Sequence, residues 1–154
     1  MSLNNHPISS VNDLFDSYSA AFELLEAKTL AFHYHLPCYF ITDEAETVFT
    51  EQSKLEGMFN QAKHFFRKYH IEKMEPEIWN KRSLTSLITE VKVIWHYKNA
   101  NGTLLYSCDY HYILKLTEQK EQKIVTSISL NEKARMDAWL KTQNIVSKTL
   151  QIGK

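Results

Sequence analysis

The fold is decided by residues 84–117, which read LTSLITEVKVIWHYKNANGTLLYSCDYHYILKLT. Apolar and polar side chains alternate on both sides of residues 99–102, as they do in strands that bury one face. The Asn-Ala-Asn-Gly sequence of residues 99–102 favours a tight turn, because asparagine and glycine accept a positive φ at little steric cost. The stretch therefore predicts two long antiparallel strands, 84–98 and 103–117, joined by a hairpin turn.

Each of these two strands has one apolar face. On strand 84–98 this face consists of Leu87, Val91, Val93, Trp95 and Tyr97, and on strand 103–117 of Cys108, Tyr110, Tyr112, Leu114 and Leu116. Asp109 and His111 fall on the other face, because successive side chains of a strand point to opposite sides. We expect the apolar faces to line the interior, and Asp109 and His111 to form a polar cluster on the outer face or at a subunit contact.

The same alternation extends beyond these strands and predicts a meander. Residues 74–81 and 123–130 are expected to form its first and last strands, and two shorter strands, 38–41 and 48–49, precede it. The apolar residues expected on one side of the last strand are Ile124, Ile128 and Leu130.

Two helices precede strand 38–41. The first is capped by Asn12 or Asp13, after which apolar residues recur at three- and four-residue steps. The second is short, residues 27–36, and Pro37 ends it because proline disfavours helical geometry in the residue before it. Both are amphipathic, so each is expected to place one face on the sheet.

Two further helices flank the meander. One is capped by Thr50 and runs to about Tyr69, and the other occupies residues 131–154 as a C-terminal extension. No repeat, linker or change of composition divides the chain. Residues 11–154 are therefore expected to form a single domain that follows a flexible N-terminus, residues 1–10.

The composition excludes several classes of protein. The chain has 154 residues, of which 44% are hydrophobic and 12% aromatic, so it can bury a substantial core. Its 18 basic and 18 acidic residues cancel, so it lacks the excess positive charge typical of proteins that bind nucleic acid or anionic membranes. The most apolar window, residues 30–41, is too short to span a membrane.

The sequence also indicates a cytoplasmic protein that needs no cofactor. Residues 1–10 lack the basic and apolar regions of a signal peptide, and the two cysteines, Cys38 and Cys108, lie in apolar runs. His33 and His35 are two residues apart at a helix end, so their side chains point in different directions. This spacing argues against a metal site.

The order of the elements resembles the nuclear transport factor 2-like superfamily, which includes ketosteroid isomerase and the SnoaL-like polyketide cyclases. The matching features are Tyr18 on the first helix, the run Tyr-His-Leu-Pro-Cys-Tyr-Phe-Ile at 34–41, the helix 50–69 and the hairpin around Gly102, within residues 12–130. The resemblance implies an α+β, cystatin-like cone, in which a curved antiparallel sheet wraps around the N-terminal helices and leaves a pocket. It also implies a homodimer formed through the convex sheet face.

The resemblance and the aromatic residues together predict a ligand pocket inside the cone. Apolar walls with a few placed polar groups are what small-molecule sites require, and buried phenols need hydrogen-bond partners. His35, beside Pro37, is a candidate base at the pocket mouth. We expect the pocket to bind a small, largely apolar molecule. The candidate ligand-binding residues are Tyr18, Tyr34, His35, Phe40, Phe59, Trp95, Tyr97, Tyr110 and Tyr112.

Two other functions stay open. The first is a cofactor-independent isomerase, dehydratase or cyclase. The isomerases of the superfamily use a tyrosine of the first helix with an aspartate base and a protonated aspartate, and the resemblance gives Tyr18 the tyrosine's role. The base is then His35, Asp43 or Asp109. The second is a dimerisation or interaction module without a pocket, whose function lies on its surface.

Overall fold

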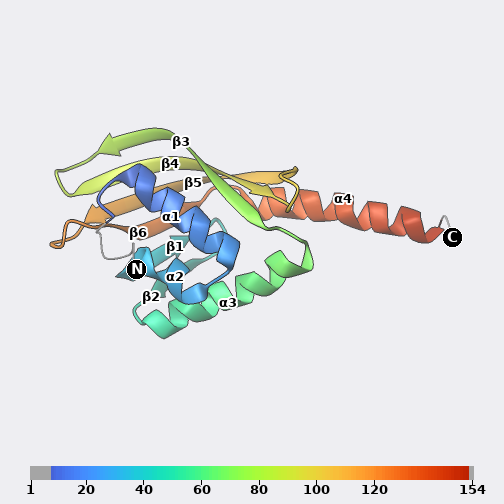
Figure 1. Cartoon of the computed structure of the whole chain (residues 1–154), viewed down its shortest axis with the longest axis horizontal. Helices are drawn as coiled ribbons and strands as arrows, with labels where there is room; N and C mark the ends of the chain where they lie inside the picture. The colour runs from blue at the N-terminus through green and yellow to red at the C-terminus, as the bar shows by residue number, and fades with distance from the viewer. Residues whose placement is uncertain (1–7, 153–154) are drawn as a thin grey trace.

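A curved six-stranded sheet forms the body of the molecule (Figure 1). The structure is a computed structural model that describes residues 8–152, and the side chains of residues 8–144. In chain order the elements are α1 (Val11–Leu24), α2 (Ala27–Phe32), β1 (Tyr34–Ile41), β2 (Glu46–Phe49), α3 (Gln52–Lys68), β3 (Lys73–Ser83), β4 (Ile88–Lys98), β5 (Leu104–Leu116), β6 (Gln122–Ser129) and α4 (Glu132–Ile152). The expected α+β architecture, helices followed by a curved open sheet, is confirmed.

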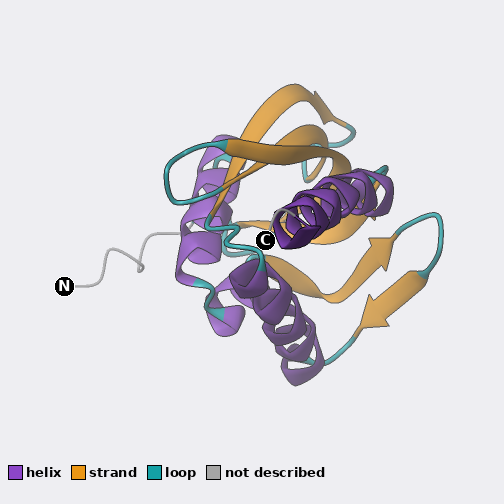
Figure 2. Ribbon diagram, turned by 90° about the vertical axis from the view of Figure 1, so that its right-hand side faces the viewer, coloured by secondary structure: helices purple, strands orange, loops and turns teal. Residues whose placement is uncertain are grey.

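The strand order is β2-β1-β6-β5-β4-β3. The meander β3 to β6 is antiparallel throughout, as predicted, whereas β1 joins the edge of the meander parallel to β6. The predicted hairpin turn is present, with Gly102 at φ 82° and its N–H donating to the carbonyl of Asn99 at 3.0 Å. Figure 2 shows the strands bending around the helical side of the molecule.

The interior face of β4 and β5 is the one that the alternation predicts. Val91, Val93, Trp95 and Tyr97 are all buried, and Trp95 lies opposite Cys108 in the register of the two strands. The expected start of β4 is wrong, because residues 84–87 form bends stabilised by Thr85 rather than strand. Leu87 is consequently 46% exposed and takes no part in the interior face.

The limits of the first helices differ from those expected. Ser10 caps α1 by accepting a hydrogen bond from the N–H of Asp13 at 3.0 Å, so Asn12 and Asp13 lie inside the helix. The short helix ends four residues early, at Phe32. His33 is buried there, with Nδ1 2.8 Å from the carbonyl oxygen of Thr29, and strand β1 begins at the next residue.

The predicted helix before the meander is present with a slightly later start. Glu51, without a side-chain capping bond, replaces Thr50 as the residue before α3, which ends at Lys68 with Tyr69 as its cap. Leu55 and Phe59 are its buried residues. Helices α1 and α3 thereby cover the interior of the sheet.

Helix α4 begins at the open end of the sheet and projects away from the body (Figures 1 and 2). Its first turns are attached to β5: Asn131 donates to the carboxylate of Asp109 at 2.7 Å and accepts from the Asp109 N–H at 2.8 Å. About two turns further along the helix, the Trp139 ring lies 5.6 Å from that of Tyr69 and 5.2 Å from that of Tyr106, measured between centroids. The predicted last residues of this helix, 153 and 154, lie outside the described residues.

Residues 8–10 of the N-terminal segment are tied to the body. The carbonyl of Ile8 accepts from the N–H of Gln122 at 2.7 Å, and Ser10 caps α1. The rest of the segment expected to be flexible, residues 1–7, lies outside the described residues. Within the part of the chain that is described, no helix combines the length and the apolar character needed to cross a membrane.

Candidate functional site

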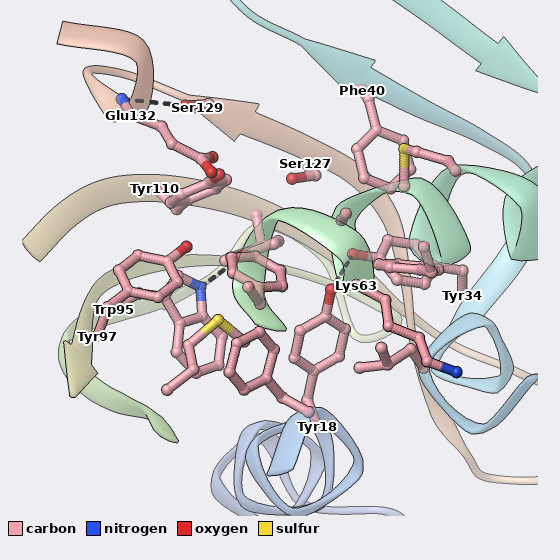
Figure 3. Close-up of a pocket in the computed structure, with 18 of the residues that line it drawn as sticks. Tyr18, Tyr34, Phe40, Lys63, Trp95, Tyr97, Tyr110, Ser127, Ser129 and Glu132 are labelled. Atoms are coloured by element: carbon pink, nitrogen blue, oxygen red, sulfur yellow. Dashed lines mark hydrogen bonds between the residues drawn. The ribbon is translucent and has the colours of Figure 1, made fainter. Parts of the chain in front are cut away.

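A cavity of about 220 Å³ lies between the interior face of the sheet and the helices α1 and α3 (Figure 3). Helix α1 contributes Tyr18, β1 contributes Tyr34 and Phe40, and the long strands β4 and β5 contribute further aromatic rings. The volume falls below the range of roughly 300–1,000 Å³ found for drug-sized ligands. The cavity therefore suits a molecule with few heavy atoms and a mainly apolar body.

Two pairs of hydrogen-bonded side chains stand in the wall of this cavity. The hydroxyls of Tyr18 and Tyr34 lie 2.9 Å apart, and Trp95 Nε1 donates to the Tyr112 hydroxyl at 2.6 Å (Figure 3). Burial raises the pKa of Tyr18 and, well above the usual value, those of Tyr34 and Tyr112. All three phenols are therefore neutral around pH 7, and they partner one another or the indole.

Among the described residues that line the cavity, Glu132 is the one that carries a carboxyl group. Glu132 is the first residue of α4, and Figure 3 shows its side chain reaching from the helix start into the cavity. Its backbone N–H donates to Ser129 Oγ at 3.4 Å, but no residue that the structure describes donates a hydrogen bond to its carboxylate. Burial raises the pKa of Glu132 to about 7. The group thus changes charge near neutrality, which suits it to exchange protons or to bind a cation.

The other charged groups near the cavity lie either on the side away from Glu132 or in a neighbouring hollow. Lys63 of α3 also lines it, but Figure 3 shows its amino group on the side away from Glu132. A second hollow of about 220 Å³ adjoins the cavity and shares Thr42, Ser129 and Glu132 with it. Asp43 and Glu44, from the turn between β1 and β2, line this outer hollow together with Lys133.

The structure brings together all the predicted ligand-binding residues except His35. His35 was expected at a helix end, but it stands on strand β1 next to the buried Tyr34 and is exposed. Alternation along the strand turns its side chain away from the interior. Asp43 reaches only the outer hollow, and Asp109 lies on the far face of the sheet, bound to Asn131.

The residues that strand β6 turns toward the interior differ from those predicted. Ile124, Ile128 and Leu130 were expected together, but Ile124 and Ser127 are the buried residues of this strand. The register of β5 and β6 shifts between Ile113 and Leu114, which moves the later residues to the opposite face. Ser127 and Ser129 therefore add hydroxyls to the cavity.

The lining also contains residues that sequence reasoning did not select. They are Phe22, Leu25, Leu30, Ile41, Thr42, Met58, Ala62, Lys63, Phe66, Met74, Ser127, Ser129 and Glu132. The apolar ones carry a signal, because they belong to the apolar patterns of the helices and strands that the sequence predicts. Glu132 carries none, because an acid in the first turn of a helix is ordinarily explained by the helix dipole.

The remaining chemically notable side chains are structural. His33 binds Ser17 Oγ through Nε2 at 2.7 Å, and burial lowers the pKa of its imidazole. Cys38 and Cys108 are free and buried, and burial raises the pKa of Cys38 to about 11. Within residues 8–152, no three histidine, cysteine, aspartate or glutamate side chains gather closely enough to hold a metal ion.

Several solved structures share this fold. A domain of unknown function with a cystatin-like fold from Nostoc punctiforme matches with 14% identity and a TM-score of 0.63, over 90% of this chain and 93% of that chain. An NTF-2 like protein of unknown function from Shewanella oneidensis has 10% identity and a TM-score of 0.62, over 78% of this chain and 95% of that chain. At such identities the likeness shows the fold and nothing finer.

A third similar structure is a ketosteroid isomerase-like protein from Erwinia carotovora atroseptica. Its identity is 11% and its TM-score 0.60, over 82% of this chain and 96% of that chain. No curated protein matches this sequence. The family model described as NTF2-like protein (DUF6841) matches residues 9–132, from the start of α1 to the first residue of α4. Since this match covers most of the chain and the fold agrees, the chain belongs to this NTF2-like family.

Proposed function

We propose that the protein binds a small, largely apolar molecule in the cavity between the sheet and the helices α1 and α3. The observation that carries the proposal is the cavity itself, about 220 Å³ in volume and walled by aromatic rings from five elements, α1, β1, α3, β4 and β5. A module that acts only through its surface has no need of such a cavity, and tight packing around Tyr18 would have filled it. The hydroxyls of Ser127 and Ser129 supply the few polar contacts that orient a ligand.

The proposal is tested with a substitution that puts a large side chain into the cavity. Ala62 lies on α3 in the lining, so Ala62→Phe places a ring where the ligand would sit. The matched control is Ala20→Phe, at an exposed position of α1. Binding is measured by NMR titration with neutral probes, namely 2-phenylethanol and a panel of small alcohols, ketones and esters.

We expect saturable shifts at residues of the cavity in the wild type and in Ala20→Phe, and affinity at least about tenfold weaker in Ala62→Phe. If no neutral probe binds, or if Ala62→Phe binds as well as the wild type, the cavity is not the binding site and the proposal is wrong.

A second candidate function is a cofactor-independent isomerase, dehydratase or cyclase, and Glu132 favours it. A carboxyl group with a pKa of about 7 can both accept and donate a proton near neutrality. Glu132 would then serve as the base in place of His35, Asp43 and Asp109, none of which lines the cavity. With a substrate in hand, Glu132→Gln should lower kcat by about 10²–10⁴-fold, the usual contribution of a general base. Unchanged turnover would exclude Glu132 as the base.

A further inference from the structure

We propose that the ligand is an organic cation, an apolar body carrying a protonated amine, with the ammonium group placed against the carboxylate of Glu132. The inference rests on the proposed binding function and deepens it by naming the class of ligand. It draws on three features: the unpartnered carboxylate, the aromatic walls, and the acidic hollow that adjoins the cavity.

The first feature is the state of Glu132. Its side chain is half-buried where the cavity meets the outer hollow, and its carboxylate finds no hydrogen-bond donor among the described residues. An ionised carboxylate without a partner is costly in a mainly apolar site, because it has lost part of its hydration. An ammonium group compensates this cost directly, since it brings both the opposite charge and N–H donors.

The second feature is the aromatic lining of the cavity that holds this carboxylate. Tyr97, Tyr110 and Trp95 line the same cavity, and the charge of Glu132 contributes, after burial, to the raised pKa of Tyr97. Aromatic rings attract cations through their negative faces, and tryptophan does so most strongly. The walls therefore favour a cation as well as an apolar body, whereas an anion would be repelled by Glu132.

The third feature is the charge of the approach. The outer hollow shares Glu132 with the cavity and carries two more acids, Asp43 and Glu44. Its one basic residue, Lys133, is already bound to the carboxylate of Asp137 at 2.8 Å. The described lining of the hollow thus carries three acids against one base, a charge balance that attracts cations.

None of the described groups that face Glu132 neutralises the charge of its carboxylate, so a ligand can do so. From the sheet these are Tyr97, Tyr106 and Cys108, and from α1 Tyr18; their raised pKa values keep all four neutral. From the β1–β2 turn they are the acids of the outer hollow, and from α3 Lys63, whose amino group lies on the other side of the cavity. An amine therefore binds best when Glu132 is ionised, and its binding expels the proton that Glu132 holds near neutral pH.

The experiment compares three probes with the same ring and a similar chain: 2-phenylethylamine as the cation, 2-phenylethanol as the neutral form and phenylacetate as the anion. Calorimetry measures the affinity of each for the whole protein between pH 6 and pH 8. The variant is Glu132→Gln, which keeps the shape of the side chain, and the matched control is Glu118→Gln, in the exposed turn after β5.

We expect the amine to bind the wild type and Glu118→Gln at least about tenfold more tightly than the alcohol at pH 8, with phenylacetate weakest. A carboxyl with a pKa of about 7 is roughly 9% ionised at pH 6 and 91% at pH 8, so amine affinity should rise about tenfold over this range. Near pH 7, amine binding should release protons to the buffer. Glu132→Gln should abolish both the preference for the amine and its pH dependence.

The outcomes separate the two proposals. If the alcohol binds in the cavity but the amine gains nothing over it, or if Glu132→Gln keeps the preference, the amine inference is overturned and the binding function stands. If none of the three probes binds and no member of the neutral panel binds either, both the binding function and the amine inference are overturned. Tighter binding of phenylacetate would overturn the inference in favour of an anionic ligand.

Discussion

At the scale of single residues, Glu132 links the stability of the protein to pH. Its pKa is raised from 4.5 to about 7 by burial, so the folded state holds the proton more firmly than the unfolded state does. The stability that the protonated Glu132 carboxyl contributes is therefore fully present below about pH 4.5, and it is lost as the pH rises through about 7. A shift of this size corresponds to about 3 kcal/mol, at 1.36 kcal/mol for each pH unit.

Glutamine at this position cannot ionise, so a protein that carries it does not lose this stability as the pH rises. Glu132→Gln should match the wild type near pH 4.5 and exceed it by up to about 3 kcal/mol in free energy of unfolding at pH 8. Urea denaturation at both values measures the difference, with Glu118→Gln as the control for a lost surface charge. A Glu132→Gln variant no more stable than the wild type at pH 8 would place the carboxylate in water.

The paired phenols give a second prediction at this scale. Tyr34→Phe removes one hydroxyl and leaves that of Tyr18 without its partner, 2.9 Å away. The cost should be about 1–2 kcal/mol, because an unpaired buried hydroxyl costs more than a hydrogen bond contributes. Tyr18→Phe with Tyr34→Phe should cost less than the two single changes together. Urea denaturation of the four proteins measures the coupling, and additive costs would show that the two hydroxyls do not interact.

Single residues also show where prediction from sequence ends. The tyrosines and Trp95 were predicted for the cavity because alternation along strands and spacing along helices are local properties. Glu132 was missed, since its burial depends on where α4 begins relative to β5 and α3. His35 was misplaced because its orientation depends on whether residues 34–36 form a helix or a strand.

At the scale of elements, α4 is held by few contacts. Trp139 packs between Tyr69 and Tyr106, and Asn131 is bound to Asp109. Trp139→Ala should lower the free energy of unfolding by about 2 kcal/mol, since each aromatic pair contributes about 0.5–1.5 kcal/mol beyond the buried area. It should also speed amide exchange in α4 while β4 and β5 stay protected.

The control for this change is Lys141→Ala, at an exposed position of the same helix. Hydrogen exchange followed by mass spectrometry resolves α4 from the sheet. If exchange in α4 were no faster in Trp139→Ala than in Lys141→Ala, Trp139 would not be what fixes the helix to the body.

Two of the errors in the elements, in α2 and in β6, occur where a local pattern meets a tertiary contact. Helix α2 ends at Phe32 because His33 is held by Thr29 and Ser17 and because Tyr34 pairs with Ile124 of the distant β6. The face of β6 changes at a register shift against β5, which no alternation within β6 reveals. The meander and its hairpin turn were predicted because their pattern is long and repeated.

At the scale of the whole molecule, the outer face of the sheet is where we expect a second copy to bind. Ile94, Ile113 and Ile128 lie on this face, opposite the cavity, in the neighbouring strands β4, β5 and β6. We expect a homodimer through this face, as the resemblance to the superfamily implies. Sedimentation velocity should show a dimer at micromolar concentration, and Ile113→Arg should convert it to a monomer that keeps its fold.

Ala100→Arg, in the exposed hairpin turn, is the control for the added charge. A monomeric wild type, or a dimer unaffected by Ile113→Arg, would contradict this prediction. The fold class itself was predicted correctly, because the order and length of the elements specify how a bent meander closes over amphipathic helices.

A crystal structure of the protein soaked with 2-phenylethanol tests whether the curved sheet and the helices α1 and α3 enclose a cavity that binds a small apolar molecule. The result expected is density for one probe molecule inside the cavity, with its ring against Trp95 and Tyr18. Density only on the surface, or a cavity closed by its own side chains, would contradict the claim.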